Sequence, residues 1–350
     1  MKIEGSHIER DIKVFCKQIG TNPLLVQGAG GNLSWKDRKV MWIKASGTWL
    51  AEAESKDIFV SVNLSHLQNA IIKQDFSVKP KIISNSSNRP SIETLLHALM
   101  PHTVVLHLHA VEILAHLVKQ NARLKIKNLV EKDDNSIFVD YFKPGQELAK
   151  AISVELLSKP NADVVFMSNH GVVIAGDSIG DIKNKLDKLL LRLKTPITHH
   201  TVKEMPELTL QLDFLERGYI PCLDQEIQQM ALNKNILNRV RHDWALYPDH
   251  VVFLGAEATI IDKKFTIIDL DKIILGKPSF IFVSGECVYE SLSVTVAQKV
   301  QLRCYYEVLL RQRSADILTK LCEQEVADLL DWDAEKFRIN ISMLEALPSG

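Results

Sequence analysis

The chain has 350 residues, 46% of them hydrophobic and 24% charged, which is typical of a globular protein with a substantial buried core. Its 42 basic and 43 acidic residues leave a net charge of -1, so no basic excess is available to bind a nucleic-acid backbone. The N-terminal sequence does not resemble a signal peptide, and no apolar run approaches the roughly 20 residues that span a bilayer. We therefore expect a cytoplasmic protein without nucleic-acid or membrane partners.

The five cysteines form no C-x-x-C pair and are far apart in the sequence. This spacing indicates reduced, structural thiols rather than a cysteine-ligated zinc site.

Short β-rich runs alternate with longer helical patterns over the first 200 residues. The clearest examples are helical patterns over residues 8–19 and 92–99 and β-rich runs over residues 40–43 and 104–108. This alternation predicts an α/β domain.

A second domain is expected from about residue 206. Residues 189–210 are weakly periodic and contain Pro196 and Pro206, which favours a boundary near residue 205. Four short strands are then predicted over residues 251–254, 259–261, 265–268 and 280–283, followed by helices over about 294–312 and 315–330. We therefore expect domains of residues 1–205 and 206–350.

Three histidines form a candidate metal site. His107 and His109 stand two residues apart in a β-rich run, so their side chains project from one face of a strand. His170 follows the apolar run 164–167, where a strand would end. An isolated H-x-H pair is more often structural, but three imidazoles with one open position are typical of a catalytic zinc site. The other nearby histidines are predicted to lie outside the ligand set: His97, His102, His116, His199 and His200.

A glycine-rich stretch, residues 28–34, offers several backbone N–H groups that suit an anion. It lacks both common nucleotide fingerprints, since Leu33 stands where G-x-G-x-x-G needs glycine and no Gly-Lys-Ser/Thr follows. Residues 45–48, Ala-Ser-Gly-Thr, form a second small polar turn. Each loop alone is more often a plain turn than a ligand site.

Together these motifs resemble the class II aldolase/adducin family. The match lies in the order and spacing of residues 31–34, 45–48, 91–93, 107–109 and 170–171. It extends over roughly residues 7–200, and residues 240–340 look like the C-terminal extension of long members. The resemblance implies a class II aldolase-like three-layer α/β/α domain with a smaller C-terminal α+β domain.

The resemblance also implies roles for particular residues. Zn²⁺ or another divalent transition metal would be held by His107, His109 and His170. Glu93 would be an additional ligand or, when substrate displaces it, the proton-transfer group. A substrate phosphate would lie against Gly31, Asn32, Ser46, Gly47 and Ser91. One departure concerns residues 91–93, which read Ser-Ile-Glu where many members have Ser-Ser-Glu, so the phosphate pocket loses one hydroxyl.

The function implied is a zinc-dependent aldolase that cleaves a small ketose phosphate or related hydroxy-ketone through a metal-stabilised enediolate. A sugar-phosphate 4-epimerase or a dehydratase would use the same site. A non-catalytic, adducin-like binding module is the alternative of another class, and the complete histidine set favours an enzyme. Family members also imply a homotetramer with active sites between subunits, although residues 124–129 lack the tyrosine that a neighbouring subunit supplies in fuculose-phosphate aldolase.

Overall fold

The computed structural model describes residues 5–84, 86–130, 135–197, 212–262 and 265–345. Within these ranges, seven strands form one sheet in the order β3-β2-β1-β4-β7-β6-β5. All neighbouring pairs are antiparallel except β5 and β6. The strands are β1 (Asn32–Asp37), β2 (Val40–Lys44), β3 (Phe59–Asn63), β4 (Val104–Leu108), β5 (Ser136–Val139), β6 (Val164–Met167) and β7 (Gly171–Gly176).

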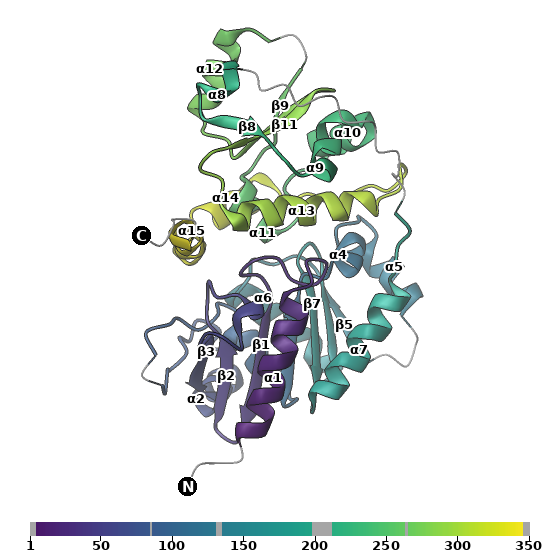
Figure 1. The fold of residues 1–350 in the computed structure, drawn as a ribbon. Coiled ribbons are helices and arrows are strands. Elements are labelled where there is room, and N and C mark those ends of the chain that lie inside the picture. Colours follow the sequence, from purple (N-terminus) through teal and green to yellow (C-terminus); the bar gives the residue numbers. More distant parts are fainter. Residues whose placement is uncertain (1–4, 85, 131–134, 198–211, 263–264, 346–350) are drawn as a thin grey trace.

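Helices cover both faces of this sheet (Figure 1). Successive side chains of β4 point to opposite faces, so Leu106 joins the core under one helix layer and Val105 the core under the other. One layer contains α1 (Gly5–Gly20), α4 (Val111–Leu117), α5 (Ala122–Leu129) and α7 (Ile179–Arg192); the other contains α2 (Leu64–Ile72), α3 (Thr94–Leu99) and α6 (Gln146–Ser158). The expected three-layer α/β/α arrangement is confirmed.

The C-terminal half is an α+β unit, as expected. Its sheet has the strand order β8-β11-β10-β9. The strands are β8 (Tyr219–Pro221), β9 (Thr259–Ile261), β10 (Phe280–Val283) and β11 (Cys287–Ser291). The helices are α8 (Leu212–Leu215), α9 (Gln225–Leu232), α10 (Lys234–His242), α11 (Pro248–Leu254), α12 (Ile267–Leu275), α13 (Val296–Leu310), α14 (Glu323–Leu330) and α15 (Asp333–Glu345).

Two of the four predicted strands are wrong. Residues 251–254 belong to α11, where Pro248 occupies the first turn, a position that proline favours in helices. Residues 265–268 contain the start of α12, whose capping box joins Thr266 and Asp269. The other two predicted strands are β9 and β10. The predicted helix over 294–312 is α13, whereas the next helix, α14, begins only at Glu323.

The predicted domain boundary near residue 205 lies outside the described residues, as do His199 and His200. The division into 1–205 and 206–350 therefore stays a prediction. In the described part of the chain, no helix is long and apolar enough to cross a membrane.

The C-terminal half packs against the end of the sheet at which β4 ends and β7 begins (Figure 1). There the Asn169 side chain donates hydrogen bonds to the carbonyl oxygens of Leu246, at 2.8 Å, and Thr319, at 2.7 Å. Buried residues of α4 and α13, among them Leu114 and Tyr305, share one apolar core. The candidate metal ligands lie at this same end of the sheet, where residues of the C-terminal half contact them.

Candidate metal centre

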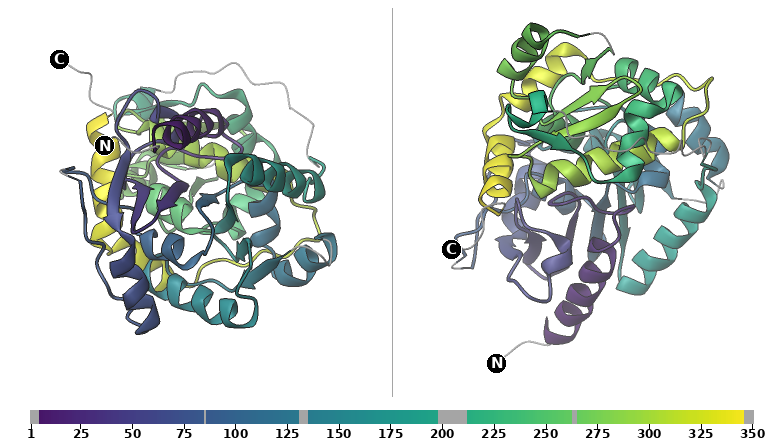
Figure 2. Two further views of the ribbon diagram at one scale, coloured as in Figure 1. Left: turned by 90° about the horizontal axis from the view of Figure 1, so that it is seen from below. Right: turned by 45° about the horizontal axis from the view of Figure 1, so that its top comes forward.

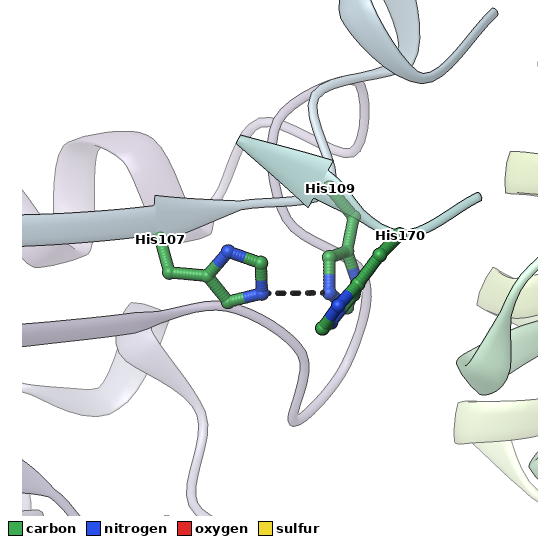
Figure 3. A group of neighbouring side chains, drawn as sticks. All are labelled: His107, His109 and His170. Carbon is green, nitrogen blue, oxygen red and sulfur yellow. Dashed lines mark hydrogen bonds between the residues drawn. The ribbon is translucent and has the colours of Figure 1, made fainter. Parts of the chain in front are cut away.

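Three histidines converge where β4 ends and β7 begins (Figure 3). His107 lies in β4 and His109 just beyond the end of that strand. His170 immediately precedes β7, the antiparallel neighbour of β4, and Leu108 pairs with Val172 in this register. One ligand nitrogen from each histidine lies within 4.8 Å of the other two. The structure therefore brings together the three predicted ligands from two segments of the chain.

The acceptor nearest to each Nδ1 atom indicates which ring nitrogens carry lone pairs. His107 Nδ1 lies 3.1 Å from the carbonyl oxygen of Val172, and His109 Nδ1 lies 3.3 Å from Oδ2 of Asp249. Each acceptor favours a proton on Nδ1, which leaves Nε2 unprotonated. The two Nε2 atoms are only 3.0 Å apart. Two lone pairs at that distance require a proton or a cation between them.

Burial makes a cation the better match. Because the site is desolvated, the pKa of His107 is lowered and that of His170 is held well below its usual value. Both rings are therefore neutral near pH 7, and neutral imidazole is the form that binds a metal ion. The donor set, three histidines beside a carboxylate, fits a divalent transition metal.

Glu93 lies beside two of the three histidines. Its Oε2 is 3.5 Å from His107 Nε2 and its Oε1 is 3.4 Å from His170 Nε2. The side-chain amide of Asn32 donates a hydrogen bond of 2.6 Å to Oε2, and Asn32 pairs with His107 across β1 and β4. A neutral donor thus holds the carboxylate beside the candidate metal-binding nitrogens, and Oε1 has no hydrogen-bond donor among the described residues.

The five predicted anion-binding residues line a pocket that also contains Glu93, His109 and His170. They are Gly31, Asn32, Ser46, Gly47 and Ser91. Two backbone hydrogen bonds tie their loops together, from Ser46 to the Arg89 carbonyl at 2.8 Å and from Ser91 to the Lys44 carbonyl at 3.2 Å. A Cβ atom on Gly31 would lie 3.0 Å from the His107 carbonyl oxygen, so glycine is required for this close approach. The roles of these five residues stay predictions.

Four ionisable residues of the pocket were not predicted from the sequence: Lys44, Asp249, Glu335 and Arg338. Lys44 is buried, and its Nζ donates to the carbonyl oxygens of Ala29, at 2.9 Å, and Thr48, at 2.6 Å. Burial, reinforced by the nearby Arg338, lowers the pKa of Lys44 to about 7. The position of Lys44 at the end of an apolar strand could have indicated a functional residue. The other three residues are far from the metal-site motifs in the sequence, and no nearby motif indicates their role.

The pocket is small and partly open to solvent. It has about 30 Å³ of free volume, roughly the space for one or two water molecules. The loop residue Pro144 and the C-terminal residues Pro248, Glu335 and Arg338 complete its wall. Residues of both halves of the chain therefore surround two of the candidate metal ligands, His109 and His170.

Residues 11–190 match the family described as the Class II Aldolase and Adducin N-terminal domain. Over 165 residues the chain is 26% identical to the L-fuculose phosphate aldolase of Methanococcus maripaludis, covering 47% of this chain and 82% of that protein. It is 29% identical over 181 residues to the methylthioribulose-1-phosphate dehydratase of Microcystis aeruginosa, covering 46% and 80% of the two chains.

A third relative is much longer than the matched region. The uncharacterized oxidoreductase YuxG of Bacillus subtilis is 29% identical over 177 residues, and the match spans 46% of this chain but only 25% of that protein. Among solved structures, the N-terminal class II aldolase domain of a conserved protein from Thermoplasma acidophilum is 24% identical, with a TM-score of 0.46, over 55% of this chain and 94% of that one.

Proposed function

This chain belongs to the class II aldolase and adducin family, and from that membership we propose that it is a metal-dependent carbon-carbon lyase. Its substrate is a small ketose phosphate or a related hydroxy-ketone. The metal is zinc or another divalent transition ion, held by His107, His109 and His170. The relatives named for L-fuculose phosphate and methylthioribulose 1-phosphate support a ketose phosphate as the substrate class.

The observation that carries this proposal is the convergence of three imidazoles beside an oriented carboxylate. A family member without catalytic function has no need for three histidine nitrogens that converge within 4.8 Å of one another. Nor does it need Glu93 aimed at two of them by Asn32. The donor set matches a catalytic site, in which one coordination position stays open to substrate.

Each residue has a distinct part in the proposed reaction. When bound, the metal supplies a Lewis acid that stabilises negative charge developing on the ketose oxygens. Glu93 takes or returns the proton as the carbon-carbon bond breaks, and Asn32 keeps its Oε2 oriented. Asn32, Ser46, Gly47 and Ser91 bind the phosphate, with Gly31 shaping the loop.

Two other reactions remain candidates because they need the same groups. A 4-epimerase would break and remake the bond after the aldehyde fragment rotates, and a dehydratase would eliminate water next to the carbonyl. The relative named as a dehydratase supports the second. The alternative of another class is an adducin-like binding module without catalysis.

We also propose that the chain forms a homotetramer with pockets near subunit interfaces. Light scattering at working concentration tests this, and a monomeric mass would contradict it.

The test of the reaction is a substrate screen with metal-loaded protein. Ketose 1-phosphates and their unphosphorylated counterparts are incubated with the zinc, cobalt or manganese form, and aldehyde release, epimer formation and loss of water are followed separately. Glu93→Gln, loaded with the same metal, is the matched control. Aldehyde release that Glu93→Gln abolishes supports the lyase. Stoichiometric metal without turnover of any member of the panel would favour the binding module.

A further inference from the structure

The C-terminal half contributes a carboxylate to the metal centre. Asp249, near the start of α11, is buried, and its Oδ2 lies 3.3 Å from Nδ1 of His109. The same oxygen accepts a hydrogen bond of 3.3 Å from Nε2 of Gln301. A Cβ atom on Gly30 would lie 3.0 Å from this oxygen and 3.2 Å from His109 Nδ1, so a glycine there leaves room for the contact.

A buried arginine holds the carboxylate in place. Arg338, on α15, lies 2.9 Å from Oδ1 of Asp249, and its side chain is 11% exposed. It also pairs with Glu335 at 2.9 Å. Burial alone would raise the pKa of Asp249, but the Arg338 guanidinium outweighs that effect and keeps this pKa well below its usual value. Each oxygen of Asp249 thus has a partner, His109 and Gln301 for Oδ2 and Arg338 for Oδ1.

The geometry points to Asp249 as the positioning residue of His109, with Arg338 fixing Asp249, so that the C-terminal half is part of the metal centre. A carboxylate on Nδ1 fixes the tautomer and the ring orientation of a metal-binding histidine and makes Nε2 a stronger donor. Val172 does the same for His107 through its backbone carbonyl. Asp249 provides the equivalent contact for the ligand that lies beyond the end of β4.

This inference rests on the proposed metal site, and its test is metal affinity. Zinc affinity is measured by competition with a chromogenic chelator for the native chain and Asp249→Asn. We expect Asp249→Asn to bind zinc roughly 10- to 100-fold more weakly, the usual effect of losing such a partner. We also expect a changed visible absorption spectrum for its cobalt form. Asp243→Asn is the matched control, because Asp243 pairs with Arg239 at 2.7 Å and does not line the pocket.

A double variant guards against misfolding. Asp249→Asn leaves Arg338 with one acidic partner fewer in a buried place, which can destabilise the fold. Asp249→Asn combined with Arg338→Gln removes both charges together, and circular dichroism checks that it folds. Native affinity and a native cobalt spectrum in the folded variants would overturn the inference. Absence of metal from the native chain would instead overturn the proposed function itself.

A separate observation concerns α15, which contributes Glu335 and Arg338 to the wall of the pocket. Figure 2 shows this yellow helix beside the purple-blue segments of the N-terminal half in both views. The Ile341 side chain lies over Gly47, where a Cβ atom would be 2.7 Å from its Cδ1. The Arg89 guanidinium stacks on the Phe337 ring at 4.3 Å. Two residues of α15 thus contact two of the loops that are predicted to bind phosphate.

The pocket's free volume of about 30 Å³ is roughly a tenth of the smallest volume typical of small-molecule sites, so in this form the pocket is too small for a ketose phosphate. With the proposed function as premise, we infer that α15 is a lid, which moves away from Gly47 and Arg89 to admit substrate and then closes over it. Closure returns Arg338 to Asp249 and shields the reaction from water. The contacts that hold the lid at its outer edge are Phe337 on Arg89 and Ile341 on Gly47.

The rate of metal extraction tests the lid without a known substrate. Zinc-loaded protein is mixed with an excess of a bulky chromogenic chelator, and zinc loss is followed with time. Phe337→Ala and Ile341→Ala weaken the lid contacts, so zinc should leave several-fold faster while equilibrium affinity stays close to native. Met343→Ala is the control on the same helix, because Met343 is 52% exposed. Equal rates in all four proteins would overturn the lid but leave the metal site standing.

Discussion

Asn32 donates a hydrogen bond of 2.6 Å to Glu93, and both side chains are buried beside the candidate metal ligands. The two residues are far apart in the sequence, and the β1–β4 pairing brings Asn32 level with His107. This contact fixes one oxygen of the carboxylate and leaves the other directed at His170. In the proposed reaction, this contact would orient Glu93 for proton transfer.

Asn32→Ala should lower kcat while leaving metal binding largely intact. A hydrogen bond to a charged group is worth roughly 1.5 to 3 kcal/mol, which corresponds to about a 10- to 100-fold loss of turnover. Steady-state kinetics on the substrate found in the screen, together with metal content, checks this. Native kcat in Asn32→Ala would show that Glu93 is oriented by other groups.

His107→Ala and Glu93→Gln should separate metal binding from proton transfer. Removing His107 takes away one of the three nitrogens, so metal and activity should be lost together. Glu93→Gln keeps the shape and removes the charge, so metal should largely remain while turnover falls by roughly 10²- to 10⁴-fold. Full activity of metal-loaded Glu93→Gln would contradict the role assigned to Glu93.

His250 should make the protein sensitive to acid. It is fully buried among Trp244, Tyr247 and Tyr305, neither ring nitrogen has a hydrogen-bond partner among the described residues, and burial lowers its pKa to about 3. In the unfolded chain its pKa is near 6.5. As pH falls below 6.5 the unfolded state gains a proton that the folded state does not, so stability is lost until the folded pKa is reached.

His250→Phe should remove this loss. The substitution should change the free energy of unfolding by about 2 kcal/mol more favourably at pH 5 than at pH 8, since one pKa unit corresponds to about 1.4 kcal/mol. Denaturant unfolding at the two pH values measures the difference, with the exposed His242→Phe as control. An identical pH dependence in the native chain and His250→Phe would show that His250 is not the acid-sensitive group.

Lys44 should make stability rise with pH above neutrality. Burial lowers its folded pKa to about 7, against about 10.5 when unfolded, so between these values the unfolded state holds a proton that the folded state has released. Stability gained between pH 7 and 9 should therefore be smaller in Lys44→Met than in the native chain. Unfolding curves at both pH values test this, and parallel behaviour of the two proteins would contradict it.

The sequence predicted the N-terminal half better than the C-terminal half for a physical reason. The strand over residues 104–108 is buried on both faces because helices cover both. As the H-x-H spacing predicted, His107 and His109 lie close together at its end. Residues 251–254 and 265–268 are equally rich in Val, Ile and Phe, so their composition favoured strands. The helix signals were the proline at 248 and the Thr266–Asp269 capping box, which short apolar runs easily obscure.

The same limit applies to the site. Short sequence motifs were enough to predict four residues of the candidate site, His107, His109, His170 and Glu93. Asp249 and Arg338 reach the pocket only because the C-terminal half packs on the end of β4 and β7, an arrangement set by tertiary contacts such as those of Asn169. Interpretation of single motifs cannot recover contacts between segments so far apart.

Metal content is the most direct test of the central claim. Protein purified without metal-chelating resin is analysed for metal, alongside a His107→Ala, His109→Ala double variant shown by circular dichroism to be folded. We predict about one zinc or similar divalent ion per native chain and none in the variant. A native chain that binds no zinc, cobalt or manganese even after incubation with each ion would contradict the metal centre and favour a non-catalytic binding module.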